Sequence, residues 1–249
     1  MTTATAARVA RRVEHVMGMP ISLALRGRHA DDAEADAAWA AVLGSLREAD
    51  RTFSTYREDS VVTAIRHGEL AVADAPAEVH EVLAIGARAE RATDGAFSVW
   101  RDGGLDPSGV VKGWAVQRAS AFLGGLDDTD FCLSAGGDMV CHSDGDPWRI
   151  GIEDPRDPGR VLAVVPVRDG AVATSGTAHR GAHLVDARTG TAPAAVAQVT
   201  VIARSLTDAD VDATAAYALG AQAAEWLGRR VGRGGLVVWD DGTTTTVTA

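Results

Sequence analysis

The sequence of 249 residues contains only two cysteines, Cys132 and Cys141. So few cysteines exclude a disulfide framework and a zinc site built from cysteine ligands. Because both residues lie among apolar neighbours, we expect buried or half-buried free thiols in a reducing compartment. A bridge between the two is the alternative.

Long hydrophobic runs are also missing. No apolar segment reaches the length needed to cross a bilayer, so no membrane span is predicted. Arg8, Arg11 and Arg12 interrupt the first twenty residues, which lack the apolar core of a secretion signal. The sequence therefore predicts a cytoplasmic location, or an extracytoplasmic one if a leader has been removed.

Positive charge is scarce. The chain has 24 lysines and arginines against 34 aspartates and glutamates, which gives a formal net charge of −10. No nucleic-acid partner is expected, because proteins that bind a phosphate backbone present a basic face. The Gly-x-Gly-x-x-Gly pattern after a strand and the Walker spacing are both absent, so neither a nicotinamide-type Rossmann site nor a P-loop is expected.

What the chain does have is an ordinary globular composition, with 46% hydrophobic and 23% charged residues. Its length fits a single domain over residues 1–249, large enough to bury a core without disulfide or metal staples. Helical and strand-like segments are mixed without regular alternation. This order favours an α+β fold over a doubly wound parallel sheet.

Apolar periodicity and turn residues predict the elements of this fold. Helices are expected at residues 31–50, capped by Asp31 or Asp32, at 76–95, after Gly113, and at 208–226. Strands are expected at residues 13–25 with a kink, 131–134, 139–142, 148–152, 161–167 and 197–203, with a closing hairpin at 234–239 and 243–248. The glycine-rich residues 102–113 are expected to form a loop before the third helix.

One segment, residues 171–190, gathers hydroxyls, imidazoles and glycines between two strand-like runs. It contains Thr174-Ser175-Gly176, then His179 and then His183-Leu184-Val185-Asp186. Glycines let a backbone approach a ligand closely, and loops on a rigid scaffold often carry binding groups. The pattern is equally typical of a solvated loop between two strands.

Asp210 and Thr214 are four residues apart in a predicted helix, so their side chains share a face. A carboxylate and a hydroxyl on one face can both bind a hard cation such as magnesium through oxygen. The alternative is an acidic residue that only complements the helix dipole.

Three other residues have chemistry that fits a nucleotide. Lys112, followed by Gly113, can hold a phosphate or can simply open a helix. Tyr56 can stack on a planar ring or pack against the protein. His183 is a candidate general base, with His179 as a competitor and a purely structural role as the alternative.

Taken in this order, the segments resemble one family, the FAD:protein FMN transferases, also called ApbE or flavin transferases. The resemblance extends from Met17 to about Gly220. Its motifs are Val16-Met17-Gly18, Phe53-Ser54-Thr55-Tyr56, Asp94-Gly95-Ala96-Phe97, Asp106-Pro107-Ser108-Gly109, Val110-Val111-Lys112-Gly113, Ala135-Gly136-Gly137-Asp138, Thr174-Ser175-Gly176, His183-Leu184-Val185-Asp186 and Asp210 with Thr214.

The resemblance implies an α+β, T-fold-like flavin transferase architecture, with mixed sheets and packed helices. It also implies FAD as substrate, Mg²⁺ as cofactor, and transfer of FMN from FAD to a Thr or Ser hydroxyl of an acceptor flavoprotein, with release of AMP. The same site with water as nucleophile would be an FAD pyrophosphatase. A non-catalytic FAD-binding protein is the third possibility.

The resemblance also assigns roles to residues. The carbonyl of Gly109, Asp210 and Thr214 are expected to hold magnesium, with Asp210 and His183 as catalytic residues. His183 is the candidate base, and Asp186 is its candidate orienting partner. The expected FAD-binding residues are Met17, Tyr56, Ala96, Phe97, Ser98, Asp106, Lys112, Thr174, Ser175, Gly176, His183 and Leu184.

The chain departs from the family pattern at two of these positions. Ser98 stands where the family often has Asp, which removes one expected flavin contact. Asp-Pro-Ser replaces the commoner Asp-Leu-Gly before Gly109.

Overall fold

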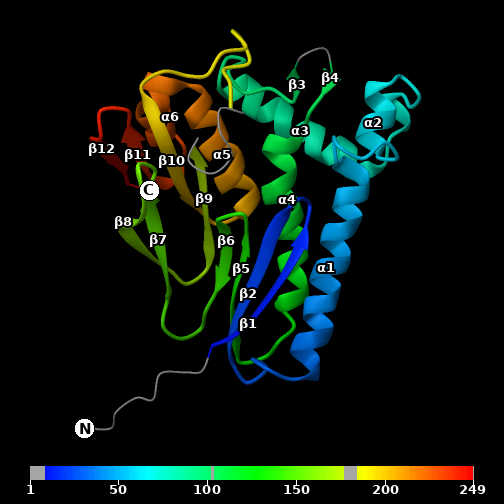
Figure 1. Ribbon diagram of the computed structural model, residues 1–249, viewed down its shortest axis with the longest axis vertical. Helices are drawn as coiled ribbons and strands as arrows, with labels where there is room; N and C mark the ends of the chain where they lie inside the picture. The colour runs from blue at the N-terminus through cyan, green and yellow to red at the C-terminus, as the bar shows by residue number, and fades with distance from the viewer. Residues whose placement is uncertain (1–8, 102–103, 177–183, 249) are drawn as a thin grey trace.

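The computed structural model describes residues 9–101, 104–176 and 184–248. Its centre is an eight-stranded sheet in the order β1-β2-β5-β6-β9-β10-β11-β12, in which neighbouring strands are antiparallel (Figure 1). The strands are β1 Ala10–Val16, β2 Met19–Gly27, β5 Thr129–Ala135, β6 Asp138–His142, β9 Gly170–Gly176, β10 Val196–Ala203, β11 Gly234–Trp239 and β12 Thr244–Val247.

Helices pack against one face of this sheet. Helix α4 contacts α1, α5 and the strands β5 and β6, while α5 contacts β9 and β10. The helices are α1 Ala33–Phe53, α2 Val61–Arg66, α3 Ala77–Ala92, α4 Ser108–Ser120, α5 Leu206–Ala218 and α6 Ala223–Gly228, with short 3-10 turns at Val72–Asp74, Ala121–Leu123 and Gly220–Gln222.

Strand alternation divides the apolar residues between the two faces of the sheet. Leu23 and Leu133 are paired in register and belong to the main core. Ala24, Cys132 and Cys141 point to the other face, where they form a second apolar cluster with residues of the β7 Trp148–Asp154 and β8 Asp157–Val167 hairpin. A small hairpin, β3 Trp100–Arg101 with β4 Gly104–Leu105, completes the described elements.

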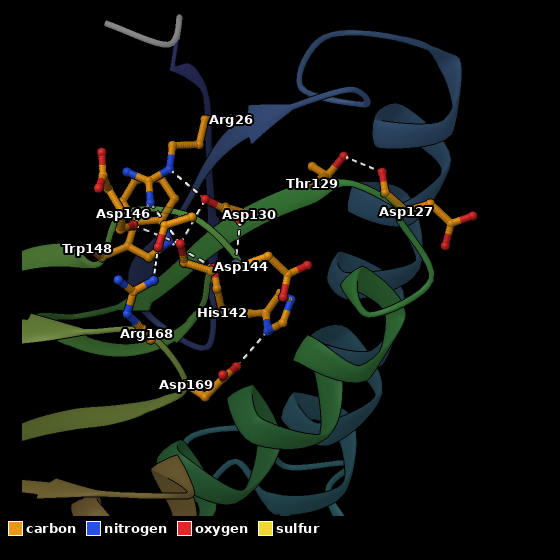
Figure 2. A network of polar contacts seen from close by, with 12 residues as sticks. Arg26, Asp127, Thr129, Asp130, His142, Asp144, Asp146, Trp148, Arg168 and Asp169 are labelled. Atoms are coloured by element: carbon orange, nitrogen blue, oxygen red, sulfur yellow. Dashed lines mark hydrogen bonds and ion pairs between the residues drawn. The ribbon is translucent and has the colours of Figure 1, made fainter. Parts of the chain in front are cut away.

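A polar network connects the ends of β2, β5 and β6 that lie opposite the β5–β6 turn. The Arg26 guanidinium of β2 donates to Asp130 of β5 at 2.8 Å and lies over the Trp148 ring of β7, 4.3 Å from its centroid (Figure 2). Ser143 donates to the same carboxylate at 2.9 Å, and the Trp148 indole donates to the carbonyl of His142. These bonds connect β2, β5, β6 and β7.

Several expected elements are confirmed. Asp32 caps α1, since its carboxylate accepts from the amide of Ala35 at 3.0 Å. The two cysteines are buried free thiols, as expected, with their sulfurs 3.5 Å apart. No helix among the described residues is long and apolar enough to cross a membrane.

Three expected boundaries are wrong. Residues 13–25 form two strands, because Met17 and Gly18 take φ angles of 56° and 70° and turn the chain into a hairpin. Helix α4 begins at Ser108, so Lys112 and Gly113 lie inside the helix and not in a loop before it. The last helix ends at Ala218, because Gly220 at φ 56° breaks it before α6.

Candidate active site

A cavity of about 300 Å³ opens between the helical layer and the sheet. Its wall combines the first turns of α4, the inward face of α5, the β5–β6 turn, the end of β9 and the middle of β7. Segments far apart in the sequence therefore meet at one place.

Most of the residues that the sequence singled out line this cavity. From the first half of the chain they are Phe97, Ser98, Asp106, Gly109 and Lys112. From the second half they are Thr174, Ser175, Gly176, Leu184, Asp210 and Thr214.

Lys112 lies in the cavity wall between two carboxylates. Its ammonium lies 2.5 Å from Asp138 Oδ2 and 3.1 Å from Asp210 Oδ1. Burial opposes the charged form of this lysine, but the two carboxylates outweigh that effect and raise its pKa. Lys112 is therefore held in its protonated form between two carboxylates of the cavity wall.

Asp210 is held firmly on α5. Its side chain is 2% exposed, and Oδ2 accepts from the amide of Gly113 at 2.8 Å. Burial raises the pKa of Asp210 to about 7, although Lys112 favours the ionised form. Burying an ionised carboxylate this deeply is costly unless a cation pairs with it.

Thr214 lies one helical turn beyond Asp210, as the spacing predicted, and its hydroxyl is 3.1 Å from that of Ser175 on β9. Gly109 is close by, because a methyl group added at Gly109 would lie 3.6 Å from Thr214 Cγ2 and 3.0 Å from the Phe97 ring. A carboxylate, a hydroxyl and a helix-start carbonyl near one cavity form an all-oxygen donor set, which fits a hard divalent cation.

Asp106 and Ser98 have partners within the protein. Arg101 donates to Asp106 Oδ2 at 2.5 Å, and Ser98 donates to Glu90 at 3.2 Å. Burial raises the pKa of Asp106, but hydrogen bonds from Ser108 and the charge of Arg101 outweigh it and lower the pKa overall. Asp106 therefore lines the cavity as a carboxylate.

Three predicted FAD-binding residues do not line the cavity. Met17 occupies the β1–β2 turn and packs against the main core. Ala96 is fully buried, and its carbonyl accepts from the amide of Ala187 at 2.9 Å. Tyr56 follows α1 and is 97% exposed, so its ring is free to stack on a ligand.

His183 and His179 lie outside the described residues. Asp186 is described, and Arg188 donates to its carboxylate from the backbone amide at 2.9 Å, from Nε at 2.9 Å and 3.1 Å, and from Nη2 at 2.6 Å. These hydrogen bonds lower the pKa of Asp186 and occupy its carboxylate, so its role as an orienting partner stays a prediction.

The sequence reasoning missed the role of Asp138. Its side chain is 1% exposed, with one oxygen on Lys112 and the other accepting from the amide of Thr174 at 2.9 Å. The only signal was its place after Gly136-Gly137, where φ angles of 56° and 100° demand glycine.

One triad of acidic residues and histidine among the described residues lies elsewhere, at His29, Asp32 and Glu34, where Asp32 already caps α1.

Solved structures share this architecture. The ApbE protein from Thermotoga maritima MSB8 superimposes with a TM-score of 0.84 at 21% identity, covering 96% of this chain and 97% of that chain. The apo form of the flavinyl transferase ApbE from Pseudomonas stutzeri gives a TM-score of 0.81 at 23% identity, covering 97% and 95%. The protein therefore has the fold of the flavin transferases.

The chain belongs to the ApbE family, whose sequence model matches residues 17–103 and 99–233. A protein named FAD:protein FMN transferase from Vibrio cholerae serotype O1 is 32% identical over 129 residues, which are 47% of this chain and 39% of that protein. One of the same name from Salmonella typhimurium is 28% identical over 151 residues, 55% of this chain and 43% of its own length. The matched region thus spans less than half of these relatives.

Proposed function

We propose that this protein is an FAD:protein FMN transferase that moves FMN from FAD to a Thr or Ser hydroxyl of an acceptor flavoprotein. The observation that carries this proposal is the convergence of Lys112, Asp210, Thr214 and the β9 end on one cavity. The names of the related proteins support the same reaction and the same substrate.

The fixed groups of the cavity suit a flavin dinucleotide. Lys112, Ser175 and Gly176 line the space where a pyrophosphate can lie, and Phe97 offers an apolar wall for a ring. Tyr56 can close over the flavin, since its side chain has no packing role to lose. Pyrophosphate cleavage depends on alignment and charge neutralisation more than on covalent work by the enzyme.

The donor set of Asp210, Thr214 and the Gly109 carbonyl fits magnesium, which when bound would neutralise charge on the phosphate oxygens. Ser175 orients the Thr214 hydroxyl through the 3.1 Å contact. In the proposed step His183 accepts the proton of the acceptor hydroxyl, whose oxygen forms a bond to the FMN phosphorus. The bond from that phosphorus to the bridging oxygen breaks, and AMP leaves with that oxygen.

The test combines the protein, FAD, Mg²⁺ and a candidate acceptor flavoprotein. We expect covalently bound flavin on the acceptor and one AMP for each flavin transferred, both abolished by Asp210→Ala in a protein that remains folded. His183→Ala should lose transfer while it retains FAD binding. AMP release without bound flavin would indicate a pyrophosphatase, and FAD binding without AMP would indicate a non-catalytic carrier.

A further inference from the structure

The cavity contains two buried carboxylates and one ammonium within contact distance. Lys112 lies 2.5 Å from Asp138 and 3.1 Å from Asp210, whose side chains are 1% and 2% exposed, against 17% for the lysine. Asp210 therefore already has an ion-pair partner that belongs to the chain, and it shares this partner with Asp138.

The two carboxylates are fixed, and the ammonium is the part that can move. Asp138 accepts a hydrogen bond from the amide of Thr174 on β9, and Asp210 accepts one from the amide of Gly113 on α4. Lys112 carries its charge on four rotatable carbon–carbon bonds, so it can shift between the two acids. Its contact with Asp138 is the shorter of the two.

Any divalent cation that binds Asp210 must share that carboxylate with Lys112. Two cations on one carboxylate repel each other strongly in a buried site, where charges are weakly screened. Metal binding at Asp210 is therefore favoured when Lys112 withdraws from that carboxylate. Among the ion-pair partners of Lys112 in the described residues, Asp138 is the buried acid that does not belong to the expected metal ligands.

We propose that Lys112 is a built-in competitor of the divalent metal for Asp210, and that Asp138 is the positioning residue that retains Lys112 when the metal enters. This inference rests on the proposed function only in taking Asp210 as a metal ligand. In this proposal one ammonium lies between two carboxylates, and Asp138 sets how readily Lys112 releases Asp210.

The proposal predicts opposite effects from two substitutions. Asp138→Asn removes the charge that draws Lys112 away, so Lys112 stays on Asp210 and metal affinity falls, on the order of tenfold for a supporting partner of a ligand. Lys112→Met removes the competitor, so metal affinity without FAD rises by a similar factor. A merely structural role for both residues would lower affinity in both variants.

The experiment measures the dissociation constant of Mn²⁺ by electron paramagnetic resonance, without FAD, for the wild type and both variants. Asp144→Asn, whose side chain is 84% exposed at the far end of β6, is the control and should leave the constant unchanged. Circular dichroism verifies folding, and Lys112→Gln replaces Lys112→Met if the latter unfolds. The isosteric Asp138→Asn keeps an oxygen for the Thr174 amide.

A lower affinity in Asp138→Asn together with a higher one in the lysine variant supports the proposal. Equal constants in all proteins, or a decrease in both variants, overturns it. The Mn²⁺ measurement does not depend on the transfer reaction. If the two variants change the dissociation constant in opposite directions but the protein transfers no FMN, the proposed function is wrong and this inference stands. Wild-type protein that binds no Mn²⁺ would overturn the metal assignment and the inference together.

Discussion

At the scale of the residue, Gly113 decides how closely α4 approaches α5. A methyl group added there would lie 2.6 Å from Asp210 Cβ and 2.6 Å from the carbonyl oxygen of Leu206. The missing side chain lets the Gly113 amide reach Asp210, so a glycine inside a helix serves the site directly.

We therefore expect Gly113→Ala to lower the free energy of unfolding by about 1–3 kcal/mol, the usual cost of overpacking. Urea denaturation of both proteins measures it. Gly44→Ala is the matched control, because Gly44 is an exposed glycine inside α1 with open space around it, and alanine there should stabilise the helix by up to about 1 kcal/mol. Equal effects at the two glycines would contradict the close packing.

A substitution at Tyr56 should change the affinity for FAD without changing the free energy of unfolding. Because its side chain is 97% exposed, Tyr56→Ala should leave the free energy of unfolding within about 0.5 kcal/mol of the wild type. FAD affinity should fall, by about 1 kcal/mol for a lost aromatic contact, and Tyr56→Phe should keep it. Flavin fluorescence titration measures both. Unchanged affinity in the alanine variant would remove Tyr56 from the site.

Some residue roles follow from sequence and others do not. The spacing of Asp210 and Thr214 fixes a shared helix face, which the structure confirms. Asp138 becomes meaningful only through Lys112 and Thr174, which approach it from other elements. A sequence pattern reports neighbours along one element, so contacts that folding creates between elements stay hidden.

At the scale of the element, the network of Figure 2 fastens β7 to the sheet through Arg26, Asp130 and Trp148. Burial raises the pKa of Asp130, but the hydrogen bonds from Arg26 and Ser143 outweigh it and lower the pKa overall. A carboxylate whose folded-state pKa is lowered adds stability above its ordinary value of about 4, and this is lost as pH falls through the lowered pKa.

Asp130→Asn should therefore lower the free energy of unfolding at pH 7 by about 1–3 kcal/mol, because Arg26 loses a charged partner. The difference from the wild type should shrink as the pH falls below about 4. Urea denaturation at several pH values measures it. Asp127→Asn, an exposed residue in the turn before β5, is the control, and an equal effect there would contradict the network.

Helix α1 was predictable because Asp32 and a regular apolar stripe both lie within the segment. The start of α4 was not predictable from the sequence, because the residues of Asp106-Pro107-Ser108-Gly109 suit a turn and a helix start equally well. The β1–β2 hairpin was hidden because Met17, a residue that rarely adopts positive φ, shares the turn with Gly18. The residues near a helix or strand boundary predict it only when they favour a single backbone conformation.

At the scale of the whole molecule, the α+β class followed from the irregular order of helices and strands. The strand order in the sheet did not follow from the sequence, because β2 pairs with β5 although all the helices from α1 to α4 lie between them in the chain. The cavity depends on this arrangement, since its lining residues come from both layers.

A ligand in this cavity should stabilise the entire fold. FAD at 100 times its dissociation constant adds about 2.7 kcal/mol, which raises Tm by roughly 5–10 °C for a chain of this length. Differential scanning fluorimetry with FAD, Mg²⁺ or both measures the shift, and FAD with Mg²⁺ should exceed FAD alone. Asp210→Ala should lose the extra shift from Mg²⁺. A Tm indifferent to FAD would contradict the site.

The pairing of β2 with β5 also sets the order of events during synthesis. Ile21, Leu23 and Leu25 reach their partners Ala135, Leu133 and Phe131 only after about a hundred further residues have been added. Until then the β2 strand of the β1–β2 hairpin has no partner on its other side, and its apolar side chains are exposed. Exposed apolar strands of this kind favour aggregation and chaperone binding. We therefore expect the maturation of the chain to be slow and assisted by chaperones, because β2 pairs with a strand that is made so much later.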